Sequence, residues 1–122
     1  MQLIEIPKDF LANFMHLKQL DLSDNQLITL EGALRNTTGL KYLNINANLF
    51  PTLNNQSFIG LNNLEGLEMS SLKHLERIEA NTFTPLESLK YFNCSFNFKL
   101  KTIHPAAFNI TKNRASFIPS EV

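Results

Sequence analysis

The sequence predicts an α/β solenoid in which one parallel β-sheet runs along the whole array. Three observations predict it. A string of apolar residues, L-x-x-L-x-L with small swaps, recurs four times. Its last three positions alternate with the period of two that strands show. A strand with one apolar face buries that face only by stacking beside its copies, as repeat architectures do. The four strings begin at Leu17, Leu40, Leu64 and Leu89, so the starts lie 23, 24 and 25 residues apart.

The predicted strands are the final part of each string. They read Leu20-Asp-Leu22, Leu43-Asn-Ile45, Leu67-Glu-Met69 and Phe92-Asn-Cys94. A bend follows each strand, at Asn25, Asn48, Leu72 and Asn97. An asparagine amide both donates and accepts, so it satisfies backbone groups at such a bend, and copies in adjacent repeats form a ladder. Because Leu72 has no amide, we expect a local irregularity in the third repeat.

A return path behind the sheet completes each repeat. A second apolar pair follows the bend: Leu27 and Leu30, Phe50 and Leu53, Leu75 and Ile78, Leu100 and Ile103. A large apolar residue comes next, at Leu34, Phe58, Phe83 and Phe108, always six residues before the first position of the next repeat. All variation in repeat length therefore lies before this column. We expect its aromatic rings to stack along the solenoid axis.

We predict one array that occupies residues 1–122. It consists of a partial repeat 1–16, the repeats 17–39, 40–63, 64–88 and 89–113, and a degenerate or truncated repeat 114–122. Arg114 stands where a leucine is expected, and an inward arginine is costly, so the regular solenoid should bend or stop there. The chain opens in the middle of a repeat, which predicts that neighbouring repeats or caps are missing.

Composition narrows the classes of function. Lys plus Arg and Asp plus Glu are 11 each, which gives no electrostatic case for nucleic acid or an anionic membrane. No apolar stretch approaches the roughly 18 residues of a membrane span, so we expect no membrane insertion in this segment. The first residues lack the features of a signal peptide. The single cysteine, Cys94, should be a small buried hydrophobe at an inward strand position, and it leaves no disulfide framework.

The chain shows no catalytic or metal-binding pattern. His16, His74 and His104 fall at unrelated repeat positions and cannot converge on one site. Asp21 and Asp24 supply two carboxylates without the further oxygen ligands that a cation needs. No nucleophile is paired with a base, and no phosphate-binding glycine loop or zinc spacing is present. We therefore predict no enzyme, no cofactor and no metal.

One segment carries the pattern of a known family. Phe83-Thr-Pro-Leu86-Glu-Ser-Leu89-Lys-Tyr-Phe92-Asn-Cys94-Ser-Phe-Asn97 resembles the extracellular, typical type of leucine-rich repeat. Such repeats build segments of Toll-like receptors, Slit proteins, small leucine-rich proteoglycans and glycoprotein-hormone-type receptor ectodomains. The resemblance implies a horseshoe with a parallel sheet on its concave side and a mostly irregular or 3₁₀ convex side with little α-helix. It also implies cysteine-rich caps, which this chain lacks.

Outward strand positions would supply a binding surface on the concave face. The candidates are Lys18, Gln19, Asp21, Lys41, Tyr42, Asn44, Glu65, Glu68, Lys90 and Tyr91. With strands roughly 4.8 Å apart, Tyr42 and Tyr91 lie roughly 10 Å apart with Gly66 between them. Tyrosine offers a large rigid face with a polar tip, which suits a protein partner. The alternatives are that these positions are merely solvated, or that the tyrosine side chains cover neighbouring strands.

Four N-x-S/T triplets bear on location, at Asn36, Asn55, Asn93 and Asn109. They are candidate N-glycosylation sites, although an asparagine-rich chain yields about two such triplets by chance. The first hypothesis is an extracellular or cell-surface recognition module that binds a protein ligand or co-receptor. The alternatives are a structural spacer within a larger array and an intracellular scaffold.

Overall fold

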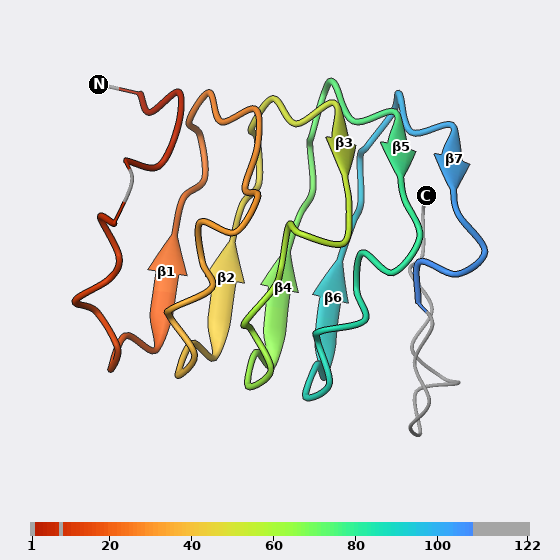
Figure 1. Ribbon diagram of the computed structural model, residues 1–122. Coiled ribbons are helices and arrows are strands. Elements are labelled where there is room, and N and C mark those ends of the chain that lie inside the picture. Colours follow the sequence, from red (N-terminus) through yellow and green to blue (C-terminus); the bar gives the residue numbers. More distant parts are fainter. Residues whose placement is uncertain (1, 8, 109–122) are drawn as a thin grey trace.

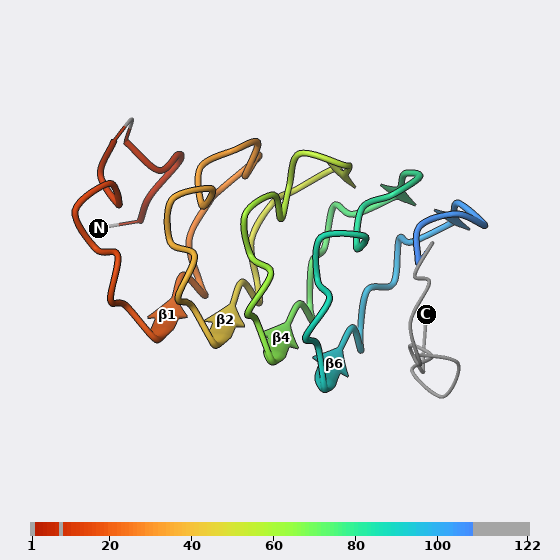
Figure 2. The same cartoon turned by 60° about the horizontal axis from the view of Figure 1, so that its bottom comes forward.

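The chain folds as a solenoid of parallel strands. A computed structural model describes residues 2–7 and 9–108 of the chain. The main sheet, sheet A, contains β1 (Gln19–Asp21), β2 (Tyr42–Asn44), β4 (Gly66–Glu68) and β6 (Tyr91–Asn93) in the order β1-β2-β4-β6. Figure 1 shows these strands side by side and pointing the same way, and Figure 2 shows the coils stacked along one axis. The predicted solenoid and its parallel sheet are confirmed.

The register of sheet A follows the repeat. Leu20 pairs with Leu43, Leu43 with Leu67, and Leu67 with Phe92. Equivalent residues therefore lie beside one another, and every inward side chain contacts its own copies in the neighbouring coils. A slip of one residue would turn these side chains to the opposite face, so burial of the apolar residues fixes the register.

A second, short sheet was not predicted. Sheet B contains β3 (Thr52–Leu53), β5 (Arg77–Ile78) and β7 (Thr102–Ile103), all parallel. It lies across the coils from sheet A (Figures 1 and 2). Its apolar residues are Leu53, Ile78 and Ile103, each the second residue of a predicted return-path pair. The sequence therefore predicted that these residues are apolar and inward, but not that they form strands. Residues 2–7 and 9–108 contain no helix of any kind, and this return side consists of turns and short strands.

The aromatic column stacks as expected. The ring centroids of Phe58 and Phe83 are 5.8 Å apart with an interplanar angle of 19°, and those of Phe83 and Phe108 are 4.6 Å apart at 23°. Phe58 and Phe83 are fully buried. Phe92 from β6 packs its edge against Phe83 with a centroid distance of 5.2 Å. One aromatic cluster thus joins the sheet to the return path in the second half of the array.

Two consecutive turns link this column to the next repeat. In the first full repeat the amide of Thr37 donates to the carbonyl of Leu34 at 3.1 Å, and the amide of Leu40 donates to that of Thr37 at 3.0 Å. Equivalent bonds join Phe58, Leu61 and Leu64, and then Phe83, Leu86 and Leu89. The constant spacing of six residues is therefore a pair of three-residue turns.

The asparagine column bridges neighbouring coils through the backbone. Asn48 is 1% exposed, and its Nδ2 donates to the carbonyls of Leu22 and Ile45 at 2.9 and 3.1 Å. Its Oδ1 accepts from the amide of Leu27 at 3.1 Å. Asn97 makes the same kind of contacts with the third repeat. The predicted ladder thus exists, but its rungs join amide side chains to backbone groups and not to one another.

The turn at Leu72 differs from those of the first two repeats. The amide of Leu75 donates to the carbonyl of Leu72 at 3.1 Å, and this extra turn holds the additional residue of the third repeat. The fourth repeat has the same turn, from Leu100 to Asn97, so the missing amide is not its cause. Leu72 is fully buried, and its own amide donates to Oδ1 of Asn97. The third and fourth repeats thus share this turn, the missing amide does not explain it, and the solenoid continues through it.

A left-handed residue precedes the asparagine column in every repeat. Asp24, Ala47, Ser71 and Phe96 have φ of 57°, 56°, 56° and 60°. A residue with a Cβ atom pays about 1–2 kcal/mol in this conformation. The repeated bend therefore stores strain at one fixed position of each coil.

Replacing Ala47 by glycine should relieve that strain. We expect Ala47→Gly to raise the free energy of unfolding by about 0.5–1 kcal/mol, because the relief exceeds the entropy that glycine loses on folding. Urea unfolding followed by circular dichroism measures it. Ala80 is not among the positive-φ residues. Ala80→Gly should instead lower the free energy of unfolding by about 0.5–1 kcal/mol. Equal changes in both variants would contradict the strain.

Candidate functional site

The outward side chains of sheet A form three rows across the strands. The register places Gln19, Tyr42, Gly66 and Tyr91 in one row and Asp21, Asn44, Glu68 and Asn93 in another. The row that precedes the strands holds Lys18, Lys41, Glu65 and Lys90. All ten residues predicted to bind a partner lie in these rows. We call this surface the sheet A face.

The two tyrosines of the sheet A face lie on either side of Gly66. Tyr42 and Tyr91 are about half exposed, at 49% and 51%, whereas Gly66 is buried. A Cβ atom added to Gly66 would lie 2.8 Å from Cδ1 of Tyr42 and 3.8 Å from Cδ2 of Tyr91. The Tyr42 ring thus covers the glycine. A hollow of about 420 Å³ opens over this point, and both tyrosines, Gly66, Asp21 and Glu68 line it.

Glu68 connects one of these tyrosines to the sheet. The hydroxyl of Tyr91 donates to Oε2 of Glu68 at 2.8 Å, and Nδ2 of Asn93 donates to Oε1 at 3.0 Å. The hydrogen bond to the Glu68 carboxylate raises the pKa of the Tyr91 hydroxyl, since a phenolate there would lose the bond and meet a negative charge. Tyr91 is therefore held in one orientation as a neutral donor.

Other side chains of the Glu68 row hold the ends of the strands. Asp21 Oδ1 accepts from the amide and hydroxyl of Ser23 at 2.9 and 2.6 Å, which lowers the pKa of the Asp21 carboxyl. Asn44 and Asn93 likewise accept at 2.9 Å from the amide two residues on. These are local turns closed by a side chain. Asp21, Asn44 and Asn93 thus have a structural task that sequence reasoning missed.

The third repeat departs from that rule. The amide of Ser70 donates to Oδ1 of Asn46 in the neighbouring coil at 2.6 Å, and not to Glu68 two residues before it. The Glu68 carboxylate is thereby released from the local turn and extends to Tyr91 and Asn93. A longer side chain at this one position changes the chemistry of the row.

In the row that precedes the strands, Glu65 forms ion pairs with lysines of the same row. Glu65 lies 3.2 Å from Nζ of Lys41 and 3.9 Å from Nζ of Lys90. Both pairs are partly exposed, so each contributes at most about 1 kcal/mol to stability. Lys41, Glu65 and Lys90 are thus already engaged with one another, whereas no ion pair in the described part of the chain involves Asp21 or Glu68.

The predicted glycosylation sites differ in accessibility. Asn36 and Asn55 are exposed on the return path. In the second triplet Ser57 is buried, and its hydroxyl accepts from the amide of Asn54. Asn93 is half-buried and bonded through both amide atoms, which disfavours it as a glycan site. Asn109 and Arg114 lie outside the described residues.

The cysteine and histidines do not form a reactive site. Cys94 is 3% exposed, and burial raises the pKa of its thiol to about 11, which keeps it neutral. This confirms a buried hydrophobe. The three histidines are exposed, and Nδ1 of His104 accepts from the amide of Ala106 in its own loop. Within residues 2–7 and 9–108, no group of three His, Cys, Asp or Glu side chains is placed to hold a metal ion.

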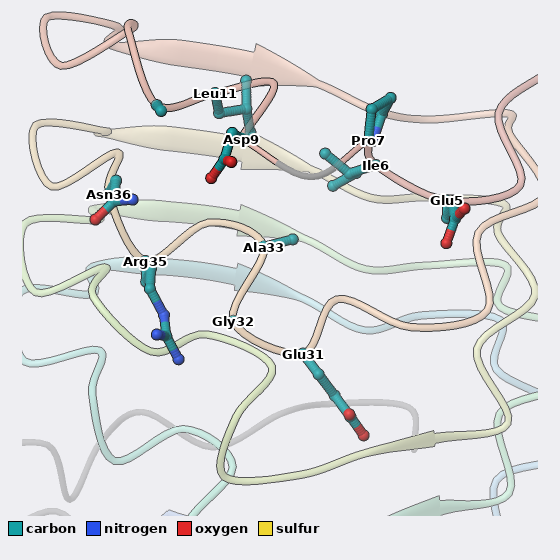
Figure 3. A pocket seen from close by; sticks show the side chains of 11 residues that line it. Glu5, Ile6, Pro7, Asp9, Leu11, Glu31, Gly32, Ala33, Arg35 and Asn36 are labelled. Atoms are coloured by element: carbon teal, nitrogen blue, oxygen red, sulfur yellow. The ribbon is translucent and has the colours of Figure 1, made fainter.

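A second hollow lies at the other end of the array. It measures about 520 Å³ and opens between residues 5–7 and 9–12 on one side and the 31–36 loop of the next coil on the other (Figure 3). In Figure 3 the Arg35 and Glu31 side chains point away from the N-terminal segment. Sheet B begins only at β3, so no strand pair closes these two coils on the return side. Polar and charged side chains line this hollow, namely Glu5, Asp9, Glu31, Arg35 and Asn36, but none of the residues predicted to bind a partner is among them.

Comparison with known proteins agrees with this architecture. No family model matches the chain. Chaoptin of Drosophila melanogaster, a leucine-rich repeat protein, is 31% identical over 100 residues, a match that covers 70% of this chain and 8% of Chaoptin. Repeat, fold and relative together fit a leucine-rich repeat protein. The chain spans less than a tenth of the length of Chaoptin, so the similarity concerns the repeat array alone. In this leucine-rich array the described residues contain no helix that crosses a membrane.

Proposed function

We propose that this chain is a non-enzymatic recognition module of an extracellular or cell-surface leucine-rich repeat protein. Sheet A is the concave side of a horseshoe, and a protein ligand or co-receptor binds there. The observation that carries the proposal is the pair of half-exposed tyrosines over Gly66, beside the hollow of about 420 Å³. Exposed tyrosines on a rigid sheet provide contact area at low entropic cost.

Location outside the cell rests on two observations. Chaoptin, with which this chain shares 31% of the aligned residues, is a cell-surface protein. Asn36 and Asn55 are exposed at positions where a glycan leaves sheet A open. A glycan at Asn36 would stand at the edge of the N-terminal hollow, which Asn36 lines. A glycan at this place would leave sheet A as the face open to a ligand. We also propose the repeat boundaries predicted from the sequence.

A structural spacer is the second candidate. The observation that favours it is that many polar side chains of the sheet A face already bond within the protein. Asp21, Asn44 and Asn93 close turns, and Glu65 pairs with two lysines. A spacer needs that self-sufficiency and no partner. An intracellular scaffold is the third candidate, and glycans on Asn36 or Asn55 would exclude it.

Site-specific photocrosslinking tests binding at the sheet A face. Benzoylphenylalanine replaces Tyr42 in the chain produced by secreting cells, and the matched control carries it at Ile28, which is 54% exposed on the return path. We expect a defined protein partner to be captured from the Tyr42 position and not from the Ile28 position. Equal capture at both positions, or none at Tyr42, would overturn the proposal in favour of the spacer.

Location has its own measurement. Secreted chain treated with an N-glycosidase should lose mass, and the change should disappear in a variant with Asn36→Gln and Asn55→Gln. An unchanged mass, with chain recovered only from the cytosol, would support the intracellular scaffold.

A further inference from the structure

The sheet A face carries two acidic groups that the protein itself does not neutralise. Asp21 and Glu68 both line the hollow of about 420 Å³. Their hydrogen-bond donors are neutral: Ser23 for Asp21, and Tyr91 and Asn93 for Glu68. Four ion pairs are formed within the described residues, and none of them reaches either carboxylate. The hollow itself contains no basic side chain.

The contrast with Glu65 shows that this is not a general property of the sheet. Glu65 lies one residue before Gly66 and three before Glu68, and Lys41 and Lys90 contact it. The lysines thus neutralise Glu65, which lies outside the hollow, and form no ion pair with Asp21 or Glu68, which line it. A cation at this place would be attracted both by the unpaired carboxylate and by the exposed aromatic faces beside it.

The aromatic walls fit the same kind of group. Tyr42 lies against Gly66 and Tyr91 is fixed by its bond to Glu68, so two ring faces flank one glycine with a carboxylate beside them. A planar guanidinium stacks on such a face and donates to a carboxylate at the same time, which an ammonium does less well. Asp21 and Glu68 stand in the same row two strands apart, at roughly 10 Å, so one extended segment reaches both.

We propose that the ligand of the sheet A face presents arginine side chains, which stack on the exposed faces of Tyr42 and Tyr91 and pair with Glu68 and Asp21. The partner is thus a protein whose contacting segment is extended and basic. This inference rests on the proposed function and adds the charge of the partner to it. Charge complementarity at a preformed hollow argues for this occupant over an acidic or a purely apolar one.

A peptide titration of the purified chain tests the proposal directly. The probe is a blocked heptapeptide with two arginines in a glycine–serine background. The matched peptides carry citrulline, which keeps the shape of arginine without its charge, or glutamate. We expect the arginine peptide to shift the backbone amide signals of Tyr42, Gly66 and Tyr91 at low ionic strength. The citrulline and glutamate peptides should bind at least about fivefold more weakly, as two exposed charge pairs are lost.

Charge-neutralising variants identify the groups. The double variant Asp21→Asn and Glu68→Gln removes both charges and keeps the local geometry, since asparagine already closes the same turn at Asn44 and Asn93. We expect it to bind the arginine peptide about tenfold more weakly. The control, Glu31→Gln with Glu79→Gln, changes the net charge equally away from sheet A and should bind like the parent chain.

The outcomes separate this inference from the proposed function. Equal binding of the arginine and citrulline peptides, tighter binding of the glutamate peptide, or equal losses in both double variants would overturn the arginine proposal. If the Tyr42 crosslinker still captures a partner whose contacting segment lacks basic residues, the binding module stands and its proposed charge preference falls. If no partner is captured at Tyr42 while the arginine peptide binds as described, the preference stands as chemistry of the hollow and the module role falls.

Discussion

Replacing Phe83 by alanine is expected to lower the free energy of unfolding by about 3–5 kcal/mol. Phe83 is fully buried and touches three other rings: Phe58, Phe92 and Phe108, with centroids 4.6 to 5.8 Å away. Alanine removes the ring and leaves a cavity where two coils and the sheet meet, which costs the transfer free energy and the lost contacts together. Because each coil of a solenoid is stabilised by its neighbours, the loss should spread beyond one repeat.

Denaturant unfolding followed by circular dichroism measures this change, and two variants control it. Phe83→Leu should cost only about 1–2 kcal/mol, because the leucine fills much of the site and Leu34 already occupies the same column in the first repeat. Phe98 is 88% exposed, so Phe98→Ala should change stability by less than about 0.5 kcal/mol. A cost for Phe98→Ala that equals the cost for Phe83→Ala would show that the stack is not the stabilising element.

The inward half of the repeat could be predicted from the sequence because its physics is periodic. Leu20, Leu43, Leu67 and Phe92 lie between outward positions, and the parallel register packs all four against one core. The same reasoning predicted the stacked rings, since a constant spacing of six residues places them at one height of each coil. The row positions of all ten candidate binding residues followed from that register.

The outward half could not be predicted in the same way, because its contacts join groups that no local pattern connects. Asp21 and Glu68 occupy equivalent positions, yet Asp21 closes a turn while Glu68 bonds Tyr91. The difference depends on the amide of Ser70, which donates to Oδ1 of Asn46 in the neighbouring coil and not to Glu68. Sheet B could not be predicted either, because two-residue strands such as Thr52–Leu53 are too short to show an alternation of apolar and polar residues.

Replacing Asn48 by alanine is expected to lower the free energy of unfolding by about 3 kcal/mol, since each buried polar group left without a partner costs about 1–3 kcal/mol. The amide of Leu27 and the carbonyl of Ile45 would both lose Asn48, and both residues are fully buried. The carbonyl of Leu22 keeps a second donor, Nδ2 of Asn25, and should contribute little. Thermal and urea unfolding measure the loss.

Asn25 provides the matched control because it makes similar bonds in a half-buried site. Its Oδ1 accepts from the amide of Leu3 at 2.8 Å, and water can replace it there, so Asn25→Ala should cost only about 1 kcal/mol. Asn48→Leu should cost as much as Asn48→Ala, even though Leu72 is tolerated at the equivalent position. A leucine side chain bonds neither the amide of Leu27 nor the carbonyl of Ile45, and the backbone bond from the amide of Leu49 to the carbonyl of Leu27 is already present beside Asn48. A mild effect of Asn48→Leu would mean that the second coil rearranges so that backbone groups bond Leu27 and Ile45, and that the asparagine column serves something other than stability.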